Sequence, residues 1–141
     1  FDQKFTFHRI ICNINHMENN DHRILICEDN EALISLIRFK LSRAGYKNCE
    51  IASDGKEAKE LLKKNSFDLV ITDIHMPFVS GLELTTFIRE ELNQKTPIII
   101  LSAEGVEDTV LQGFGLGIND FITKPFSPQE LIIRVKKLLD N

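Results

Sequence analysis

The chain has few cysteines and no arrangement of them that is typical of a metal site or a redox pair. Among its 141 residues only Cys12, Cys27 and Cys49 are cysteine. They show no CxxC spacing, and no histidine is placed to complete a zinc site with them. A free thiol inside a predicted strand, as at Cys27 and Cys49, behaves as a small hydrophobic group. The simplest setting for such a chain is a reducing cytosol.

Long apolar runs are also absent. No segment approaches the roughly 20 consecutive apolar residues that cross a bilayer, and the first residues lack the basic, apolar and small-residue regions of a signal peptide. We therefore expect a cytoplasmic protein that is not inserted in a membrane. The formal net charge is -4. Because no stripe of Lys and Arg is set against that charge, we expect no direct contact with nucleic acid.

The composition is that of one globular domain. Hydrophobic residues make up 43% of the chain and charged residues 27%, which is enough for one core in a chain of this length. Residues 1–21 have scattered apolar positions with no clean period, and we interpret them as an N-terminal extension: a tag, an upstream linker or a native tail. Residues 22–141 are expected to form the domain.

From His22 onward, short apolar segments alternate with amphipathic ones. Strands are predicted over 23–27, 48–52, 67–72, 98–101 and 118–123, and helices over 31–44, from the cap Asp54 onward, 80–92, 106–114 and from the cap Ser127 onward. The fourth helix is predicted to be the weakest, because each of its glycines lowers helix propensity by about 1 kcal/mol. Five βα units with right-handed crossovers predict an α/β fold with a doubly wound, five-stranded parallel sheet.

Polar residues stand where four of these strands end. Glu28 and Asp29 follow the first strand, Asp73 the third, Ser102 the fourth and Lys124 the fifth. The carboxyl ends of strands in an open parallel sheet meet in one crevice, so these positions are predicted to form a single site. Three carboxylates, a hydroxyl and an ammonium group indicate chemistry on a phosphate with a divalent metal.

Each of these residues has an ordinary alternative when it is considered alone. Glu28 and Asp29 suit the N-terminus of a helix, and Asp73 and Ser102 are also residue types that cap turns and helices. An isolated lysine is usually solvated. Three clustered acids, however, repel one another by about 4 kcal/mol per pair at 4 Å and an effective dielectric of 20, unless a cation lies between them. With Mg²⁺ bound, Asp73 is placed to attack phosphorus, as other carboxylates do in forming aspartyl phosphates.

Lys124 precedes Pro125, which favours a tight turn and allows a cis peptide bond. At this edge of the sheet its ammonium group is expected to pair with Asp73 and then with a phosphoryl oxygen.

Several motifs occur in order and at characteristic separations: Ile24–Asn30, Asp54–Gly55 with Ala58, Asp68–Pro77 with Gly81, Leu101–Ala103 and Asn119–Phe126. In these motifs residues 22–141 closely resemble the receiver domain of response regulators in bacterial two-component signalling. The combination is far more specific than any single short pattern. The resemblance implies a flavodoxin-like sheet with strand order 2-1-3-4-5 and five helices.

The resemblance also implies a role for each matching residue. Asp73 corresponds to the phosphoacceptor, and Mg²⁺ would be bound by Glu28, Asp29, Asp73 and the backbone carbonyl of His75, whose imidazole is expected to face solvent. Lys124 corresponds to the phosphate-contacting lysine, and the switch pair corresponds to Ser102 and Phe121. An ordinary core aromatic is an equally good interpretation of Phe121, because alternate buried positions of strands favour such residues.

The function implied is a phosphorylation switch in a phosphorelay. A sensor histidine kinase or a histidine phosphotransfer protein would donate the phosphoryl group, and a downstream effector domain or protein would recognise the changed surface. Such a domain catalyses its own phosphorylation and dephosphorylation and is not a turnover enzyme. A dimer through the fourth helix, fifth strand and fifth helix is a further expectation.

Three other functions fit parts of the pattern. A flavodoxin-like FMN carrier has a similar sheet, but Glu28 and Asp29 would repel its phosphate. An aspartyl phosphatase of the haloacid dehalogenase type has a second acid two residues after the nucleophile, where this chain has His75. The third alternative is a receiver-shaped docking module that is never phosphorylated. The pattern is also compatible with a stand-alone regulator, the receiver of a DNA-binding protein or the terminal receiver of a hybrid kinase.

Overall fold

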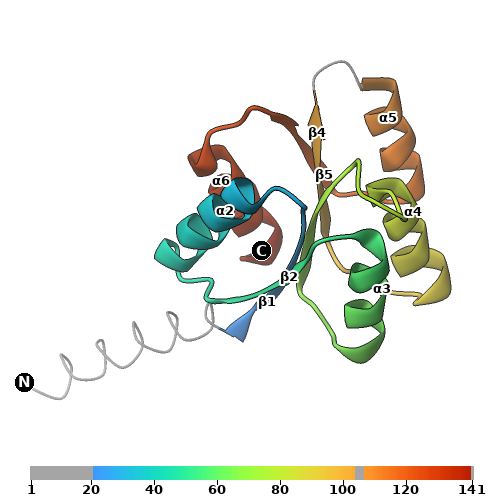
Figure 1. The fold of residues 1–141 in the computed structure, drawn as a ribbon, viewed down its shortest axis with the longest axis horizontal. Coiled ribbons are helices and arrows are strands. Elements are labelled where there is room, and N and C mark those ends of the chain that lie inside the picture. Colours follow the sequence, from blue (N-terminus) through green and yellow to red (C-terminus); the bar gives the residue numbers. More distant parts are fainter. Residues whose placement is uncertain (1–20, 104–106, 141) are drawn as a thin grey trace, which may run out of the picture.

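A computed structural model describes residues 21–103 and 107–140. Five parallel strands lie in the order β2-β1-β3-β4-β5, with helices on both faces of the sheet (Figure 1), which confirms the predicted fold and strand order. The predicted N-terminal extension lies outside the described residues except for Asp21. Within the described ranges, no helix combines the length and apolar character needed to cross a membrane.

The elements alternate along the chain as βα units. The strands are β1 (Arg23–Cys27), β2 (Asn48–Ala52), β3 (Leu69–Asp73), β4 (Ile98–Ala103) and β5 (Asp120–Lys124). The helices are α2 (Glu31–Arg43), α3 (Gly55–Lys64), α4 (Gly81–Thr86) with its continuation η1 (Phe87–Glu91), α5 (Glu107–Leu116) and α6 (Pro128–Leu139).

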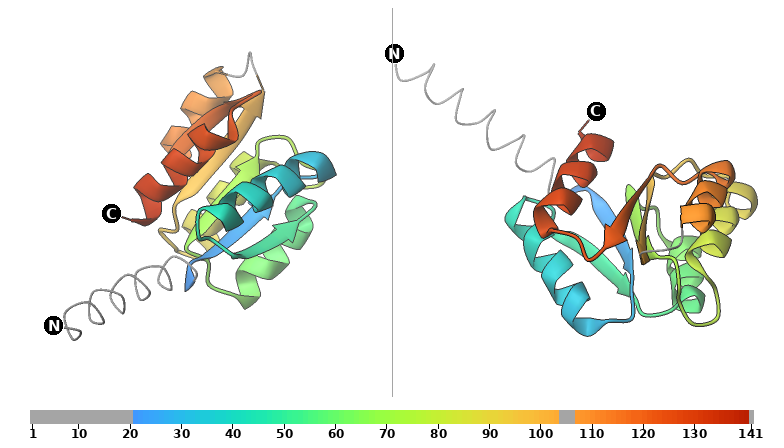
Figure 2. Two further views of the ribbon diagram at one scale, coloured as in Figure 1. Left: turned by 90° about the vertical axis from the view of Figure 1, so that its left-hand side faces the viewer. Right: turned by 90° about the horizontal axis from the view of Figure 1, so that it is seen from above.

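Two hydrophobic cores lie on opposite faces of the sheet, because side chains alternate along each strand. In β1, Leu25 faces the core that α3, α4 and η1 cover, whereas Ile24 faces the core under α2 and α6. The views in Figure 2 show the helices in these two layers. Residues 98–101 of β4 are completely buried, as predicted for a central strand covered on both faces.

Short polar side chains cap the N-termini of four of the helices. Each accepts a hydrogen bond from the backbone N–H three residues ahead and so satisfies one of the free donors of the first turn. The four caps are Asn30, Asp54, Ser80 and Ser127, with donor–acceptor distances of 3.0, 2.8, 3.1 and 3.2 Å. The caps at Asp54 and Ser127 and the helix start at Ser80 agree with the sequence prediction.

Three of the strands differ from the prediction at one or both ends. β3 begins at Leu69 rather than at Phe67, and Asp68 instead exchanges two 2.8 Å hydrogen bonds with the backbone of Arg23. β5 begins at Asp120 rather than at Ile118, because the turn that ends α5 includes the preceding residues. β4 continues to Ala103. β3 and β5 each end one residue later than predicted, so Asp73 and Lys124 are the last residues of their strands, and Ser102 lies inside β4.

The helix predicted over 80–92 changes its winding halfway. Its first part is α-helical, and the segment η1 is a π-helix in which the N–H of Leu92 donates to the carbonyl of Phe87, 3.0 Å away. The apolar spacing did not indicate this change. α5 extends two residues beyond its predicted end at Phe114, and its predicted first residue, Val106, lies outside the described residues.

Candidate functional site

Three carboxylates meet at the carboxyl edge of the sheet. β1 and β3 are neighbours with Cys27 opposite Thr72, so the residues that come next lie side by side. Ligand oxygens of Glu28, Asp29 and Asp73 all lie within 4.8 Å of one another. Among the described residues no other set of three acids, histidines or cysteines is grouped in this way. The predicted convergence of these three acids is confirmed.

Glu28 is buried, with only 1% of its surface exposed. Its Oε1 accepts hydrogen bonds from the backbone N–H groups of Asp29 and Asn30, both at 3.2 Å. Its Oε2 accepts a hydrogen bond from Lys124. The alternative in which Glu28 or Asp29 caps the first helix is wrong, since Asn30 caps α2. A charged side chain that is buried and not used as a cap is typical of a functional site.

Lys124 connects the acids from the opposite side of β3. Its Nζ lies 3.0 Å from Glu28 Oε2 and 3.2 Å from Asp73 Oδ2. The ion pair with Asp73 was predicted, whereas the second pair with Glu28 was not. The peptide bond between Lys124 and Pro125 is cis, in agreement with the sequence analysis.

The ionisation of these groups reflects competition between burial and pairing. Burial raises the pKa of Glu28, and the negative charge of Asp73 raises it further, although Lys124 and the backbone N–H groups oppose this change. Burial lowers the pKa of Lys124, but the hydrogen bond and charge of Glu28 and the charge of Asp73 raise it above the ordinary value overall. Lys124 is therefore a permanent cation at neutral pH.

The donor set suits a hard divalent cation. All three clustered side chains offer carboxylate oxygens, the ligands that Mg²⁺ prefers, and one ammonium group cannot neutralise three negative charges. Asp29 is exposed, so the cluster is open to solvent on that side. His75 is also exposed, as expected for a side chain that faces solvent.

Ser102 lies on β4, next to the strand that ends in Asp73, and Phe121 lies on the edge strand β5. Ser102 is buried in β4 opposite Thr123, and Phe121 pairs with Ile100 in the same ladder. The ring of Phe121 is half-buried and contacts the ring of Phe114 edge-on, with centroids 5.9 Å apart. Phe121 thus packs on the core but also reaches a partly exposed aromatic of α5.

Two glycines hold the loop that follows Asp73. The N–H of Gly81 donates to the carbonyl of Ile74 at 2.9 Å, and a Cβ at Gly81 would lie 2.5 Å from the carbonyl oxygen of Asp73. The N–H of Gly55 donates to the carbonyl of Pro77 at 3.3 Å, and a Cβ at Gly55 would overlap with Val79. Both glycines stood in the sequence motifs, but the contacts that require them depend on the packing of α3 and α4 against this loop.

The comparisons with known proteins agree with one another. The family model described as the response regulator receiver domain matches residues 24–136. Transcriptional regulatory protein SrrA of Staphylococcus aureus is 39% identical over 118 residues, which cover 84% of this chain and 48% of that protein. The chain thus spans about half the length of this curated relative.

Solved receiver structures are similar over nearly the same region. The receiver domain of the Francisella response regulator 1452 has a TM-score of 0.78 and 36% identity, covering 85% of this chain and 98% of that one. The chemotaxis response regulator CheY4 of Vibrio cholerae has a TM-score of 0.77 and 30% identity, covering 84% and 98%.

Proposed function

Because this chain belongs to the response regulator receiver domain family, we propose that it receives a phosphoryl group on Asp73 and changes its partner-binding surface in response. The observation that carries the proposal is the convergence of Asp73 with two further acids and Lys124 at one edge of the sheet. Residues 22–141 form the signalling domain and residues 1–21 an N-terminal extension. The domain catalyses its own phosphorylation and its later dephosphorylation. It is not a turnover enzyme.

The chemistry is in-line displacement at phosphorus. A carboxylate oxygen of Asp73 forms the new bond to phosphorus while the P–N bond of a donor phosphohistidine breaks, and the electron pair stays on the imidazole nitrogen. Lys124, 3.2 Å from Asp73 Oδ2, is placed to exchange that contact for one with a phosphoryl oxygen. Glu28 keeps Lys124 in place, because Glu28 Oε2 lies 3.0 Å from the same ammonium nitrogen.

Glu28, Asp29, Asp73 and the backbone carbonyl of His75 would hold Mg²⁺. When bound, Mg²⁺ supplies the positive charge that lets an anionic phosphoryl group approach three carboxylates. The fit rests on the 4.8 Å grouping of the carboxylate oxygens. The same grouping disfavours an FMN carrier, because the buried carboxylate of Glu28 stands where that cofactor's phosphate would need donors.

The phosphorylated state is recognised through the neighbouring strands. A phosphoryl group adds a charge of about -2 and new acceptor oxygens, and the hydroxyl of Ser102 donates to one of them. Phe121 is the second switch residue, and its ring packs edge-on against Phe114 in the second half of α5. The upstream partner is a sensor histidine kinase or a histidine phosphotransfer protein. The downstream partner is an effector domain or protein.

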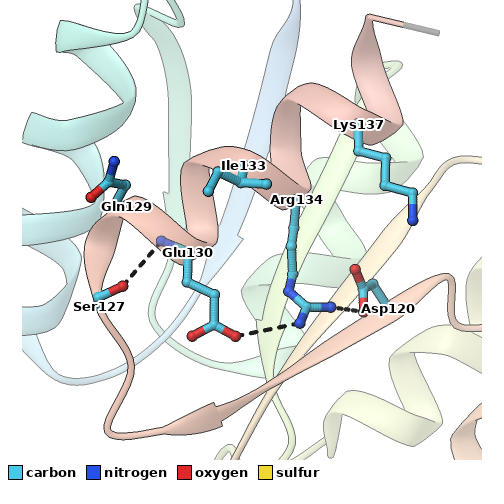
Figure 3. Close-up of a pocket in the computed structure, with 7 residues that line it drawn as sticks. All are labelled: Asp120, Ser127, Gln129, Glu130, Ile133, Arg134 and Lys137. Carbon is cyan, nitrogen blue, oxygen red and sulfur yellow. Dashed lines mark hydrogen bonds and ion pairs between the residues drawn. The ribbon is translucent and has the colours of Figure 1, made fainter.

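A second copy of the chain is a further partner, through α5, β5 and α6, the predicted fourth helix, fifth strand and fifth helix. The surface formed by β5 and α6 contains a cavity of about 420 Å³ lined by Asp120, Ser127, Gln129, Glu130, Ile133, Arg134 and Lys137 (Figure 3). On this surface Arg134 pairs with Asp120 at 2.6 Å and with Glu130 at 3.3 Å, beside the exposed Ile133. An apolar side chain surrounded by charges of both signs is suited to self-complementary contact across a two-fold axis.

The proposal is tested by incubating the protein with Mg²⁺ and acetyl phosphate and then measuring the intact mass. The wild-type protein is expected to gain one phosphoryl group, whereas Asp73→Asn gains none, because the amide is a poor nucleophile toward phosphorus. Glu90→Gln, which removes an exposed carboxylate in η1, is the matched control and is expected to behave as wild type.

Two outcomes separate the alternatives. A wild-type protein that takes up no phosphoryl group would support the unphosphorylated docking module. Equal uptake by wild type and Asp73→Asn would assign the phosphate to another residue.

A further inference from the structure

Arg89, on the π-helical segment η1, donates hydrogen bonds to three residues in two other segments of the chain. Its Nε and Nη2 donate to the carbonyl of Gly117 at 3.2 and 2.9 Å, its Nη1 donates to the carbonyl of Gln94 at 2.9 Å, and its Nη2 also donates to Asn119 Oδ1 at 3.1 Å. All of these acceptors are neutral oxygens. The planar fork of a guanidinium group suits such simultaneous bonds, which a lysine cannot reproduce.

These acceptors lie at the carboxyl ends of two helices. Gly117 directly follows α5, and Gln94 lies three residues after the end of η1. The last carbonyls of a helix lack internal donors and carry partial negative charge, so a cation there is favourable. Gly117 has φ +110° and completes the turn in which the N–H of Ile118 donates to the carbonyl of Gly113 at 3.1 Å. A Cβ at Gly117 would lie 3.0 Å from Arg89 Nε.

The same contacts fix the beginning of β5. Asn119 exchanges two 2.9 Å hydrogen bonds with the backbone of Ile98, through its own N–H and its side-chain oxygen. The next residue, Asp120, is held by Arg134 from α6 on the other face of the sheet. β5 is an edge strand that pairs only with β4. Arg89 and Arg134, from opposite faces of the sheet, therefore both contact the beginning of this edge strand.

The fixed end of α5 lies far from the phosphoacceptor. α5 returns along β4 in the opposite direction, so its first residues are near the carboxyl edge that contains Ser102, and its last residues are near Ile98 at the start of β4. The edge that contains the phosphoacceptor and the turn bound by Arg89 therefore lie at opposite ends of α5.

We propose that Arg89 is a positioning residue that fixes the carboxyl end of α5 and the start of β5, so that the rearrangement caused by phosphorylation is confined to the first half of α5. The proposal rests on phosphorylation of Asp73 for its second part only. The first part concerns the unmodified protein and is tested without a phosphodonor.

The first experiment follows amide hydrogen exchange residue by residue by NMR in the unmodified protein. Arg89→Met is expected to speed exchange of the Ile118 and Asn119 amides at least about tenfold, because local opening then costs fewer contacts. Arg89→Lys keeps the positive charge and serves as the more conservative variant in case Arg89→Met does not fold. Its exchange rates are expected to lie between those of the wild type and Arg89→Met. Arg38→Met, at an exposed position of α2, is the matched control and leaves these rates unchanged. Unchanged exchange in both Arg89 variants would overturn the proposal.

The second experiment repeats the measurement with Mg²⁺ and acetyl phosphate, with uptake of the phosphoryl group checked by intact mass. In the wild type, exchange is expected to change over 107–112 and to stay constant over 113–119. In Arg89→Lys the change is expected to extend to residue 119, with uptake as in the wild type. Equal changes in both halves of wild-type α5 would overturn the confinement. A lack of uptake would refute the proposed function, and the first experiment would still decide whether Arg89 fixes this end.

Discussion

The position of Asp73 depends on a residue with no side chain. Gly81, the first residue of α4, brings its backbone against the carbonyl of Asp73, where a Cβ would lie 2.5 Å from the oxygen. Gly115 in α5 is the opposite case, because a Cβ there would meet nothing within 4 Å. The same residue type is therefore required by close packing at one position and is only a weak point of a helix at the other.

This contrast makes a prediction for two alanine substitutions. Gly81→Ala is expected to lower the free energy of unfolding by roughly 1–3 kcal/mol, because the backbone must shift to admit the methyl group. Gly115→Ala is expected to raise it by up to about 1 kcal/mol, because alanine is the better helix former. Urea denaturation of both variants measures the two changes. A Gly81→Ala protein as stable as the wild type would mean that the loop after Asp73 adapts without cost.

The residues of the site were predictable from the sequence, but not all of their contacts. Strand-end positions and residue types predicted that Asp73, Lys124 and the acids after β1 would meet, since parallel strands end at one edge. The sequence did not predict that Lys124 would also pair with Glu28, or that backbone N–H groups would hold the other oxygen of Glu28. Those contacts depend on rotamers and on the register of β5, which no local pattern specifies.

At the scale of the helices and strands, the sequence predicted the features that depend on contacts between nearby residues. Caps at Asp54 and Ser127 were predictable because a short side chain bonds its own helix. The π-helical turn of η1 was not predictable, because the apolar period is compatible with either winding. Arg89 in this segment makes long-range hydrogen bonds with Gly117 and Asn119, which no local pattern specifies.

The end of α6 is held by a distant tyrosine. Tyr46, before β2, is fully buried, and its hydroxyl donates to the carboxylate of Asp140 at 3.2 Å. Burial, together with the nearby negative charge of Asp140, raises the pKa of Tyr46 from its ordinary value to about 12. Because the folded state favours the neutral phenol, its contribution to stability is complete below pH 10 and is lost as the pH rises from about 10 to 12.

Tyr46 is the only tyrosine in a chain without tryptophan, so its ionisation can be followed by ultraviolet absorbance. The folded protein is expected to ionise with a midpoint near 12, against about 10 in urea. Urea denaturation between pH 9 and 12 should show the wild type losing roughly 2–3 kcal/mol more stability than Tyr46→Phe, in which no phenol ionises. A midpoint near 10 in the folded state, or equal losses in the two proteins, would contradict this account.

For the molecule as a whole, the two edges of the sheet offer different surfaces to partners. β5 lies at one edge, next to α5 on one face and α6 on the other, so these three elements form one continuous side of the domain (Figure 2). That side contains Phe114, 43% exposed, and Ile133, 61% exposed. The opposite edge ends in β2, whose Glu50 is paired with Arg23 at 2.8 Å.

This asymmetry predicts where a phosphorylated dimer forms. With Mg²⁺ and acetyl phosphate, the wild type is expected to form dimers at concentrations where the unmodified chain is a monomer, as measured by sedimentation velocity. Ile133→Glu is expected to weaken the dimer at least about tenfold, because a two-fold axis brings two added charges into one apolar contact. Phe39→Glu, at a 56% exposed position of α2, is the matched control and leaves the dimer intact. Equal weakening by both substitutions, or a wild type that stays monomeric once its mass shows the phosphoryl group, would assign the β5–α6 surface to a different partner.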